Sequence, residues 1–140
     1  MPTTADSNLE LRVYLEDTDA GGIVYHASYL RFLERARTEW LRAMGLQQSQ
    51  TFDDDVSFVV HSMKLRFLRP ARLDEQLGVS CVPVTVRAAS IVFEQRVNEL
   101  ESGELCCQAE VRVACIRLRS GRPRRIPEAI VRHALSQQGS

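Results

Sequence analysis

The chain has 140 residues, enough for a single domain with a hydrophobic core of its own. Its 18 basic and 18 acidic side chains give a formal net charge of zero, so bulk charge indicates neither a nucleic acid nor an anionic membrane as partner. No apolar run approaches the roughly 18 residues that cross a bilayer, and the first ten residues lack the pattern of a signal peptide. We therefore expect a cytoplasmic protein without a transmembrane segment.

The first predicted element is a β-strand over residues 9–16, because apolar and polar side chains alternate there. One face carries the apolar residues Leu9, Leu11, Val13 and Leu15. The composition of residues 17–22, two aspartates followed by two glycines, predicts a turn after this strand. We expect one domain over residues 1–140, with loose ends at about 1–7 and 136–140.

A long helix is predicted over residues 28–44. Apolar side chains recur there at the three- and four-residue spacing of one buried stripe: Tyr29, Phe32, Leu33, Ala36, Trp40, Ala43 and Met44. Gly45 supplies a stop. With a rise of about 1.5 Å per residue, such a helix is about 25 Å long and reaches across a small sheet.

The rest of the chain reads mainly as strand. After a polar loop at 47–55, four strands are predicted, at 56–68, 77–86, 90–100 and 105–118, followed by a short helix at 127–137. The short connections favour hairpins and a largely antiparallel sheet. The predicted fold class is α+β, a five-stranded antiparallel sheet wrapped around one long helix.

The four cysteines indicate neither a disulfide framework nor a metal site. Cys81, Cys106, Cys107 and Cys115 all fall in predicted strands, and no two of them form a C-x-x-C pair. Buried free thiols are the simplest interpretation. We expect no metal and no cofactor.

The turn at 17–22 carries the strongest chemical signal. Its glycines allow close approach of a ligand, a carboxylate stands beside it, and the following helix start offers unpaired N–H groups to a developing negative charge. A structural turn, in which each aspartate binds its own backbone, explains the same residues. A calcium loop is a distant third interpretation, because its twelfth position requires glutamate and holds Ser28 here.

Two segments resemble a known family. Residues 13–30 read VYLEDTDAGGIVYHASYL and continue into FLERARTEWL at 32–41, while residues 63–75 read MKLRFLRPARLDE. Both are similar to YbgC-type acyl-CoA thioesterases, relatives of 4-hydroxybenzoyl-CoA thioesterase with the hot-dog fold. The resemblance implies hydrolysis of acyl-CoA to a free acid and coenzyme A, by dimers that pair into tetramers with the active site at a subunit interface.

The resemblance also assigns residues. Asp19 matches the catalytic carboxylate, and His26 matches the position whose backbone N–H faces the thioester carbonyl. Tyr14, Gly22 and Tyr25 are the expected substrate-binding residues, while Asp17 is expected to hold the turn. Leu15 stands where many members have tyrosine, so no role for a phenol is carried over to that position.

Two routes are open for Asp19: it acts as general base on a water molecule, or it attacks the carbonyl as a nucleophile and forms a mixed anhydride. Competing functions are a hot-dog hydratase and a module that binds acyl thioesters or acyl carrier protein without hydrolysis. Acyl carrier protein is also a possible donor of the thioester. Release of free thiol separates these functions.

Overall fold

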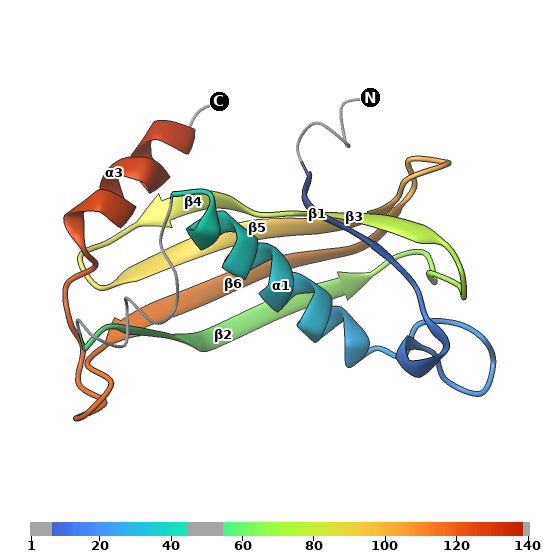
Figure 1. The fold of residues 1–140 in the computed structure, drawn as a ribbon, viewed down its shortest axis with the longest axis horizontal. Helices are drawn as coiled ribbons and strands as arrows, with labels where there is room; N and C mark the ends of the chain where they lie inside the picture. Colours follow the sequence, from blue (N-terminus) through green and yellow to red (C-terminus); the bar gives the residue numbers. More distant parts are fainter. Residues whose placement is uncertain (1–6, 45–54, 139–140) are drawn as a thin grey trace. The chain divides into compact units, whose positions relative to one another are not determined.

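The computed structural model describes residues 7–44 and 55–138 (Figure 1). The chain forms two compact units. Unit 1 comprises Met1–Glu39, Leu65–Cys81 and Gln95–Ala109, and unit 2 comprises Trp40–Lys64, Val82–Glu94 and Glu110–Ser140. The expected helix stop at Gly45 and nearly all of the expected polar loop at 47–55 lie outside the described residues. Most of the expected loose ends lie outside them too, but Ser7 belongs to the first strand.

The described residues contain six strands, which form one sheet in the order β1-β3-β5-β6-β2, with β4 also paired to β5. Their bounds are β1 Ser7–Arg12, β2 Ser57–Phe67, β3 Gln76–Ser80, β4 Val82–Val86, β5 Ser90–Glu99 and β6 Leu105–Ile116. The β1–β3, β3–β5 and β4–β5 pairs are antiparallel. The predicted α+β class with an antiparallel sheet is therefore confirmed.

One predicted strand, 77–86, is in fact divided at Cys81 into β3 and β4. Over residues 7–44 and 55–138 the sheet therefore has six strands rather than the predicted five. The cause lies at Ser80, the last residue of β3. Its hydroxyl oxygen accepts the backbone N–H of Arg96 at 3.0 Å, and its carbonyl accepts the side-chain amide of Gln95 at 3.2 Å. Side-chain groups thus replace the regular ladder at this point, and the strand is interrupted.

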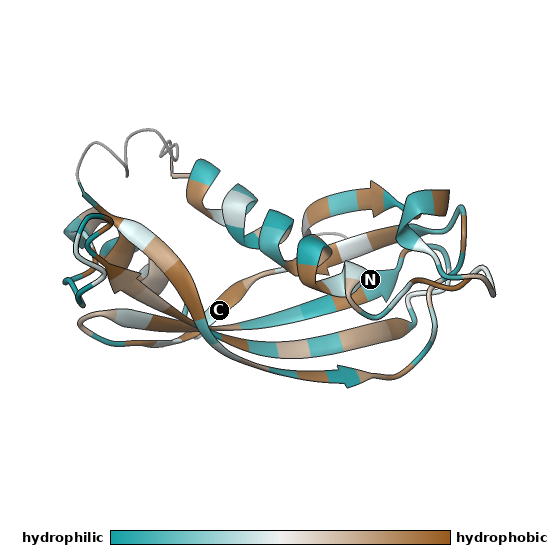
Figure 2. Ribbon diagram, turned by 90° about the horizontal axis from the view of Figure 1, so that it is seen from below, coloured by the Kyte–Doolittle hydropathy of each residue, from teal (hydrophilic) through white to brown (hydrophobic). Residues whose placement is uncertain are grey.

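The predicted helix is α1, Ser28–Arg42, and Ala43 and Met44 form a turn after it. The expected stripe is buried over the helix itself, at Tyr29, Phe32, Leu33, Ala36 and Trp40. Figure 2 shows the matching alternation of apolar and polar positions along the helix.

A polar contact fixes α1 to β5 within unit 1. Gln95 is fully buried, and its side-chain amide donates to the carbonyl of Leu33 at 3.0 Å. Its carbonyl oxygen accepts the Arg37 guanidinium at 2.9 Å. A buried amide is stable only when such groups are paired, so this contact specifies where the helix lies along the strand.

The first strand ends earlier than predicted. β1 stops at Arg12, and Leu15–Asp17 form a 3-10 turn, η1. The expectation that Leu15 faces the core is wrong, because its side chain is 74% exposed. The Asp17 carboxylate accepts the backbone N–H of Tyr14 at 2.9 Å, and this bond turns the chain before the alternation is complete.

Unit 2 contains the predicted terminal helix as α3, Glu128–Gln137, with Pro127 at its N-cap. Trp40, almost fully buried, packs edge-on against Phe93 with ring centroids 5.0 Å apart. Its indole N–H donates to Gln137 at 2.6 Å. Among the described helices, none is long and apolar enough to cross a membrane.

Candidate active site

The two aspartates lie in a tight hairpin loop, which we call the Asp19 loop, residues 17–24. Thr18 and Val24 form an antiparallel bridge across its base. Nearer the tip, the Asp19 N–H donates to the Ile23 carbonyl at 2.9 Å, and the Gly22 N–H donates to the Asp19 carbonyl at 3.1 Å. Gly22 has a φ of +79°, which favours glycine at this position.

A second segment of unit 1 supports the Asp19 loop. The Ala71 carbonyl accepts the Val24 N–H at 2.8 Å, and the Leu73 N–H donates to the Gly22 carbonyl at 3.1 Å. The Ala71 N–H in turn donates to the phenol oxygen of Tyr29, in the first turn of α1, at 3.2 Å. The loop, the supporting segment and the helix start are therefore joined by hydrogen bonds.

The Asp19 carboxylate is exposed and only partly used by the protein. Oδ1 accepts the Gly21 N–H at 2.9 Å, which orients the side chain. Oδ2 has no hydrogen-bond partner among residues 7–44 and 55–138. This oxygen is available to a water molecule or to an electrophile.

Asp17, in contrast, is buried and fully engaged. Besides the bond from Tyr14, its carboxylate lies 3.5 Å from the Arg31 guanidinium. Its carbonyl accepts the Tyr25 N–H at 2.9 Å and the Ser28 hydroxyl at 3.0 Å. Asp17 therefore holds both ends of the turn, in line with the structural role expected for it.

The start of α1 presents unpaired amides. The Ser28 N–H donates to the Tyr25 carbonyl at 2.8 Å. The N–H groups of His26 and Ala27, in contrast, have no acceptor within the described part of the chain. Free N–H groups at a helix start carry partial positive charge and attract anionic oxygen. They are suitable donors for an oxyanion.

The five residues expected at the site lie on this loop and on its two flanks. Gly22 shares the loop turn with Asp19, whereas Tyr14 bonds to Asp17 through its backbone. The rings of Tyr25 and His26 contact each other, with centroids 4.5 Å apart. Tyr14 and Tyr25 expose 62% and 48% of their surface, so both are accessible to a ligand. In the described chain, no hydrogen bond or ion pair joins Asp19 directly to His26.

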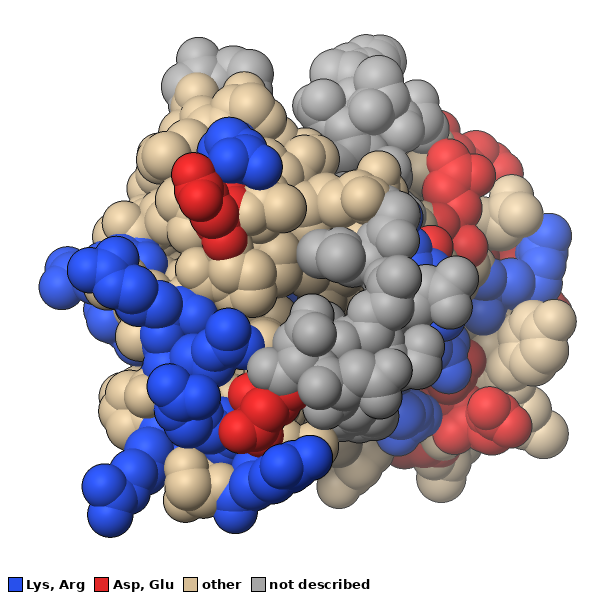
Figure 3. Space-filling model, turned by 60° about the vertical axis from the view of Figure 1, so that its left-hand side comes forward, with Lys and Arg blue, Asp and Glu red and all other residues tan. Residues whose placement is uncertain are grey.

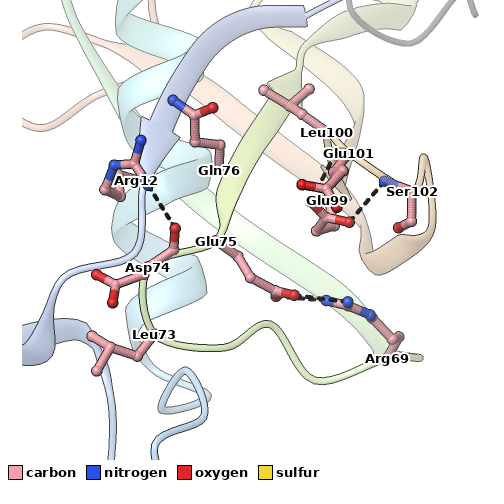
Figure 4. Close-up of a pocket in the computed structure, with 10 residues that line it drawn as sticks. All are labelled: Arg12, Arg69, Leu73, Asp74, Glu75, Gln76, Glu99, Leu100, Glu101 and Ser102. Atoms are coloured by element: carbon pink, nitrogen blue, oxygen red, sulfur yellow. Dashed lines mark hydrogen bonds and ion pairs between the residues drawn. The ribbon is translucent and has the colours of Figure 1, made fainter.

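A cavity of about 780 Å³ in unit 1 was not foreseen from the sequence (Figure 4). Leu73, which bonds to Gly22 of the Asp19 loop, is part of its wall. The other lining residues are Arg12, Arg69, Asp74, Glu75, Gln76, Glu99, Leu100, Glu101 and Ser102. Since four acidic side chains stand against two arginines, the cavity does not favour phosphate groups.

The charges of this cavity are largely satisfied by the protein. Arg69 forms a bidentate ion pair with Glu75, with hydrogen bonds of 2.6 and 2.8 Å. Hydrogen bonding by Arg69 holds the pKa of Glu75 below its usual value. Glu99 accepts the backbone N–H groups of Glu101 and Ser102, both at 2.8 Å, and hydrogen bonding by Ser102 lowers its pKa. Arg12 donates to the Asp74 carbonyl at 2.7 Å. The cavity wall is therefore held in a defined arrangement.

All four cysteines are free and buried, as predicted. Burial raises the pKa of Cys107 to about 12 and raises that of Cys81 as well. Thiols in this state are poor nucleophiles at neutral pH. The described residues also contain no group of three side chains that could hold a metal ion.

Comparison with known proteins shows the family of this chain. The family model for the thioesterase-like superfamily matches residues 13–134. The acyl-CoA thioester hydrolase YbgC of Escherichia coli O6:H1 is 46% identical over 121 residues, covering 86% of this chain and 90% of that protein. The acyl-CoA thioesterase YbgC of Haemophilus influenzae is 41% identical over 121 residues, covering 86% and 88%.

A solved structure supports the fold. The 1,4-dihydroxy-2-naphthoyl-CoA thioesterase from Synechocystis superposes with a TM-score of 0.84 at 23% identity, covering 91% of this chain and 93% of that one. The hot-dog fold and the resemblance to YbgC-type proteins, both expected from the sequence, are thereby confirmed. The chain belongs to the thioesterase-like superfamily, as a relative of the YbgC-type acyl-CoA thioesterases.

Proposed function

We propose that this protein hydrolyses acyl-CoA thioesters, with Asp19 as the catalytic carboxylate and the backbone N–H of His26 as oxyanion donor. The observation that carries the proposal is the unbonded Oδ2 of Asp19, on a loop tied by hydrogen bonds to a helix start with free amides. The acyl-CoA activity of the two YbgC relatives gives the substrate class. Tyr14, Gly22 and Tyr25 are the proposed substrate contacts.

In the proposed reaction, the carbonyl oxygen of the thioester accepts the His26 N–H and carries the negative charge of the tetrahedral intermediate. Asp19 removes a proton from water as the water oxygen adds to the carbonyl carbon and forms this intermediate. The intermediate then collapses, and its carbon–sulfur bond breaks. The sulfur leaves as a thiolate and is then protonated. In the nucleophilic route, an Asp19 carboxylate oxygen attacks the carbonyl carbon and expels the thiolate. Water then cleaves the resulting mixed anhydride.

The test is the rate of thiol release by Asp19→Asn, which keeps the size of the side chain and removes its basicity. Turnover should fall by at least about 10²-fold, since both routes need the carboxylate. Asp74→Asn is the matched control: Asp74 is exposed, and asparagine tolerates its φ of +73°. A near-normal rate in Asp19→Asn, checked by mass spectrometry for deamidation, contradicts the proposal.

The same assay distinguishes the substrate classes. Thioesters of acyl carrier protein are proposed as a second class of substrate, to be compared with short, long and aromatic acyl-CoAs. A hydratase or a pure binding module would bind these ligands without releasing thiol. We further propose that both units belong to one domain; the expected cytoplasmic location stays a prediction.

We propose that the active protein is a homo-oligomer, a dimer or a pair of dimers. The support comes from β2, an edge strand of the sheet, where unpaired backbone groups would otherwise face water. Along and just after this strand, large apolar side chains are exposed: Val59, Val60, Phe67 and Leu68. Pairing of β2 with a second copy would cover both the edge and these side chains.

A further inference from the structure

The connection between β6 and α3 forms a hairpin that the proposed hydrolysis does not use. We call residues 117–125 the arginine hairpin. The Arg117 N–H donates to the Arg122 carbonyl, and the Gly121 N–H donates to the Arg117 carbonyl, both at 2.8 Å. At the base, Ile116 and Pro123 form a bridge. The hairpin is therefore held by the backbone and presents its side chains outward.

The charge of this hairpin is strongly one-sided. It contains five arginines, at positions 117, 119, 122, 124 and 125, and no acidic residue occurs anywhere from 111 to 127. The net charge of zero for the whole chain thus hides a concentrated basic surface. Figure 3, in which the left-hand side of Figure 1 comes forward, shows Lys and Arg side chains gathered on one part of the molecule.

Four of these arginines are available to a partner. Arg117, Arg119, Arg122 and Arg125 are exposed, and none of the four forms an ion pair with a residue that the structure describes. The Asp55 carboxylate does contact the hairpin, but it accepts the backbone N–H of Arg119 at 3.0 Å rather than its guanidinium. The positive charge of these four arginines is therefore not neutralised by an ion pair within the described chain.

An apolar side chain accompanies the charge. Leu118 lies between Arg117 and Arg119 and is 46% exposed. Arginines that surround an exposed leucine on a protruding hairpin suit the boundary of a lipid bilayer, where guanidinium groups bind phosphates and the apolar side chain enters the acyl-chain boundary. A soluble acidic protein would satisfy the charge but gives no particular reason for the exposed leucine.

We propose that the arginine hairpin docks the protein onto bilayer surfaces that contain anionic phospholipids. Each arginine near such a surface contributes about 1 kcal/mol, so the four exposed arginines are sufficient for reversible binding without a membrane-spanning helix. The interaction is a peripheral one, and salt weakens it.

The experiment is co-sedimentation of the full chain with phosphatidylcholine vesicles, with and without phosphatidylglycerol. We expect binding only to the anionic vesicles, and loss of binding in high salt. Arg119→Gln combined with Arg122→Gln should bind about 30-fold more weakly. Leu118→Ser, which leaves all charges in place, should bind about 3- to 10-fold more weakly.

The charge-matched control combines Arg35→Gln, on the exposed side of α1, with Arg132→Gln on α3. It should bind like the wild type, and a melting curve verifies the fold of each variant. Equal loss in the control would show that only net charge matters and would overturn the proposal. Absence of binding to anionic vesicles would do the same.

Two further outcomes assign the hairpin to other partners and therefore also overturn the proposal. One is binding to soluble polyglutamate but not to vesicles, which would indicate an acidic protein. The other is a raised KM for acyl-CoA in the Arg119→Gln, Arg122→Gln variant without vesicles, which would indicate the phosphates of the substrate. Since thiol release is measured separately, failure of the docking proposal leaves the proposed hydrolysis intact.

Discussion

The phenol oxygen of Tyr29 and the backbone N–H of Ala71, 42 residues apart, are joined by a hydrogen bond of 3.2 Å. Ala71 also accepts the Val24 N–H, so Tyr29 at the start of α1 supports the Asp19 loop through a single intermediate residue. Tyr29 is buried, and burial raises the pKa of its phenol. The positions of the carboxylate and of the free amides are therefore coupled.

Tyr29→Phe should lower both stability and turnover. The variant keeps the ring contacts with Phe32 and Phe67 but leaves the buried Ala71 N–H without its acceptor, at a cost of about 1–3 kcal/mol. We expect kcat to fall more than KM rises, because the support of the loop is lost and not a substrate contact. Denaturant unfolding and steady-state kinetics measure the two effects. Tyr25→Phe, at an exposed ring, is the stability control and should unfold like the wild type.

His26→Ala and His26→Pro separate the side chain from the backbone. Alanine keeps the N–H. Proline removes it, and this N–H donates no hydrogen bond to any residue that the structure describes. If the amide is the oxyanion donor, proline should reduce turnover about 10²- to 10³-fold and alanine much less. Thiol release and circular dichroism of both variants give the comparison. Equal turnover of the two variants would remove the backbone N–H from the mechanism.

Asp17→Ala should destabilise the protein by about 1–2 kcal/mol, because it removes the acceptor of the partly buried hydrogen bond from the Tyr14 N–H that forms the turn. Asp17→Asn keeps an acceptor oxygen for the Tyr14 N–H and should therefore lose less stability than Asp17→Ala. Urea unfolding of the two variants measures the difference. The reverse order of stability would mean that the ion pair with Arg31, rather than the hydrogen bond to Tyr14, holds the turn.

The pair between Arg69 and Glu75 predicts sensitivity to acid. Its hydrogen bonds lower the pKa of Glu75 in the folded state, so its contribution is present above the unfolded-state pKa and is lost as the pH falls through the folded-state value. The melting temperature of the wild type should therefore fall between about pH 5 and about pH 3. Glu75→Gln should show a shallower fall over this range. Glu128→Gln, which removes an exposed partner on α3, should keep the wild-type slope.

Val60→Lys tests the oligomer. Val60 is 46% exposed on the edge strand β2, and a lysine there would be buried in the proposed pairing between two copies. Sedimentation should give a mass of at least two chains for the wild type and a smaller mass for the variant. Leu135→Lys, at an exposed residue of α3, should keep the wild-type mass. A wild-type mass of one chain, 15.9 kDa, would refute the proposed oligomer.

Local patterns predicted the parts of the fold that depend on local periodicity. The apolar stripe of α1 identified the helix because side chains three and four residues apart share one face. The end of β1 was not predicted correctly, because it depends on the hydrogen bond from the Tyr14 N–H to the Asp17 carboxylate. This bond turns the chain although the alternation of apolar and polar residues continues to residue 16. The cavity was missed because Arg69 and Glu75 meet across an irregular segment that no periodicity describes.

For the candidate site, the sequence indicated the loop and the helix start but not what supports them. The contribution of Asp17 was foreseen from turn chemistry. The contact between Tyr29 and Ala71 was not, because an aromatic residue in a helical stripe reads as ordinary core. Turn composition alone did not distinguish a structural turn from a catalytic loop at residues 17–22. The match to the thioesterase-like superfamily favours the catalytic interpretation.

The buried Gln95 has a consequence for the reaction. It uses both ends of its amide to hold Leu33 and Arg37, on adjacent turns of α1. A slip of the helix by one turn, about 5.4 Å, would break both bonds and carry the His26 amide out of reach of a thioester carbonyl. The proposed hydrolysis requires the His26 amide, at the start of α1, to stay aligned with the thioester carbonyl. This alignment thus depends on Gln95, an uncharged side chain that binds α1 about two turns further along and does not contact the substrate.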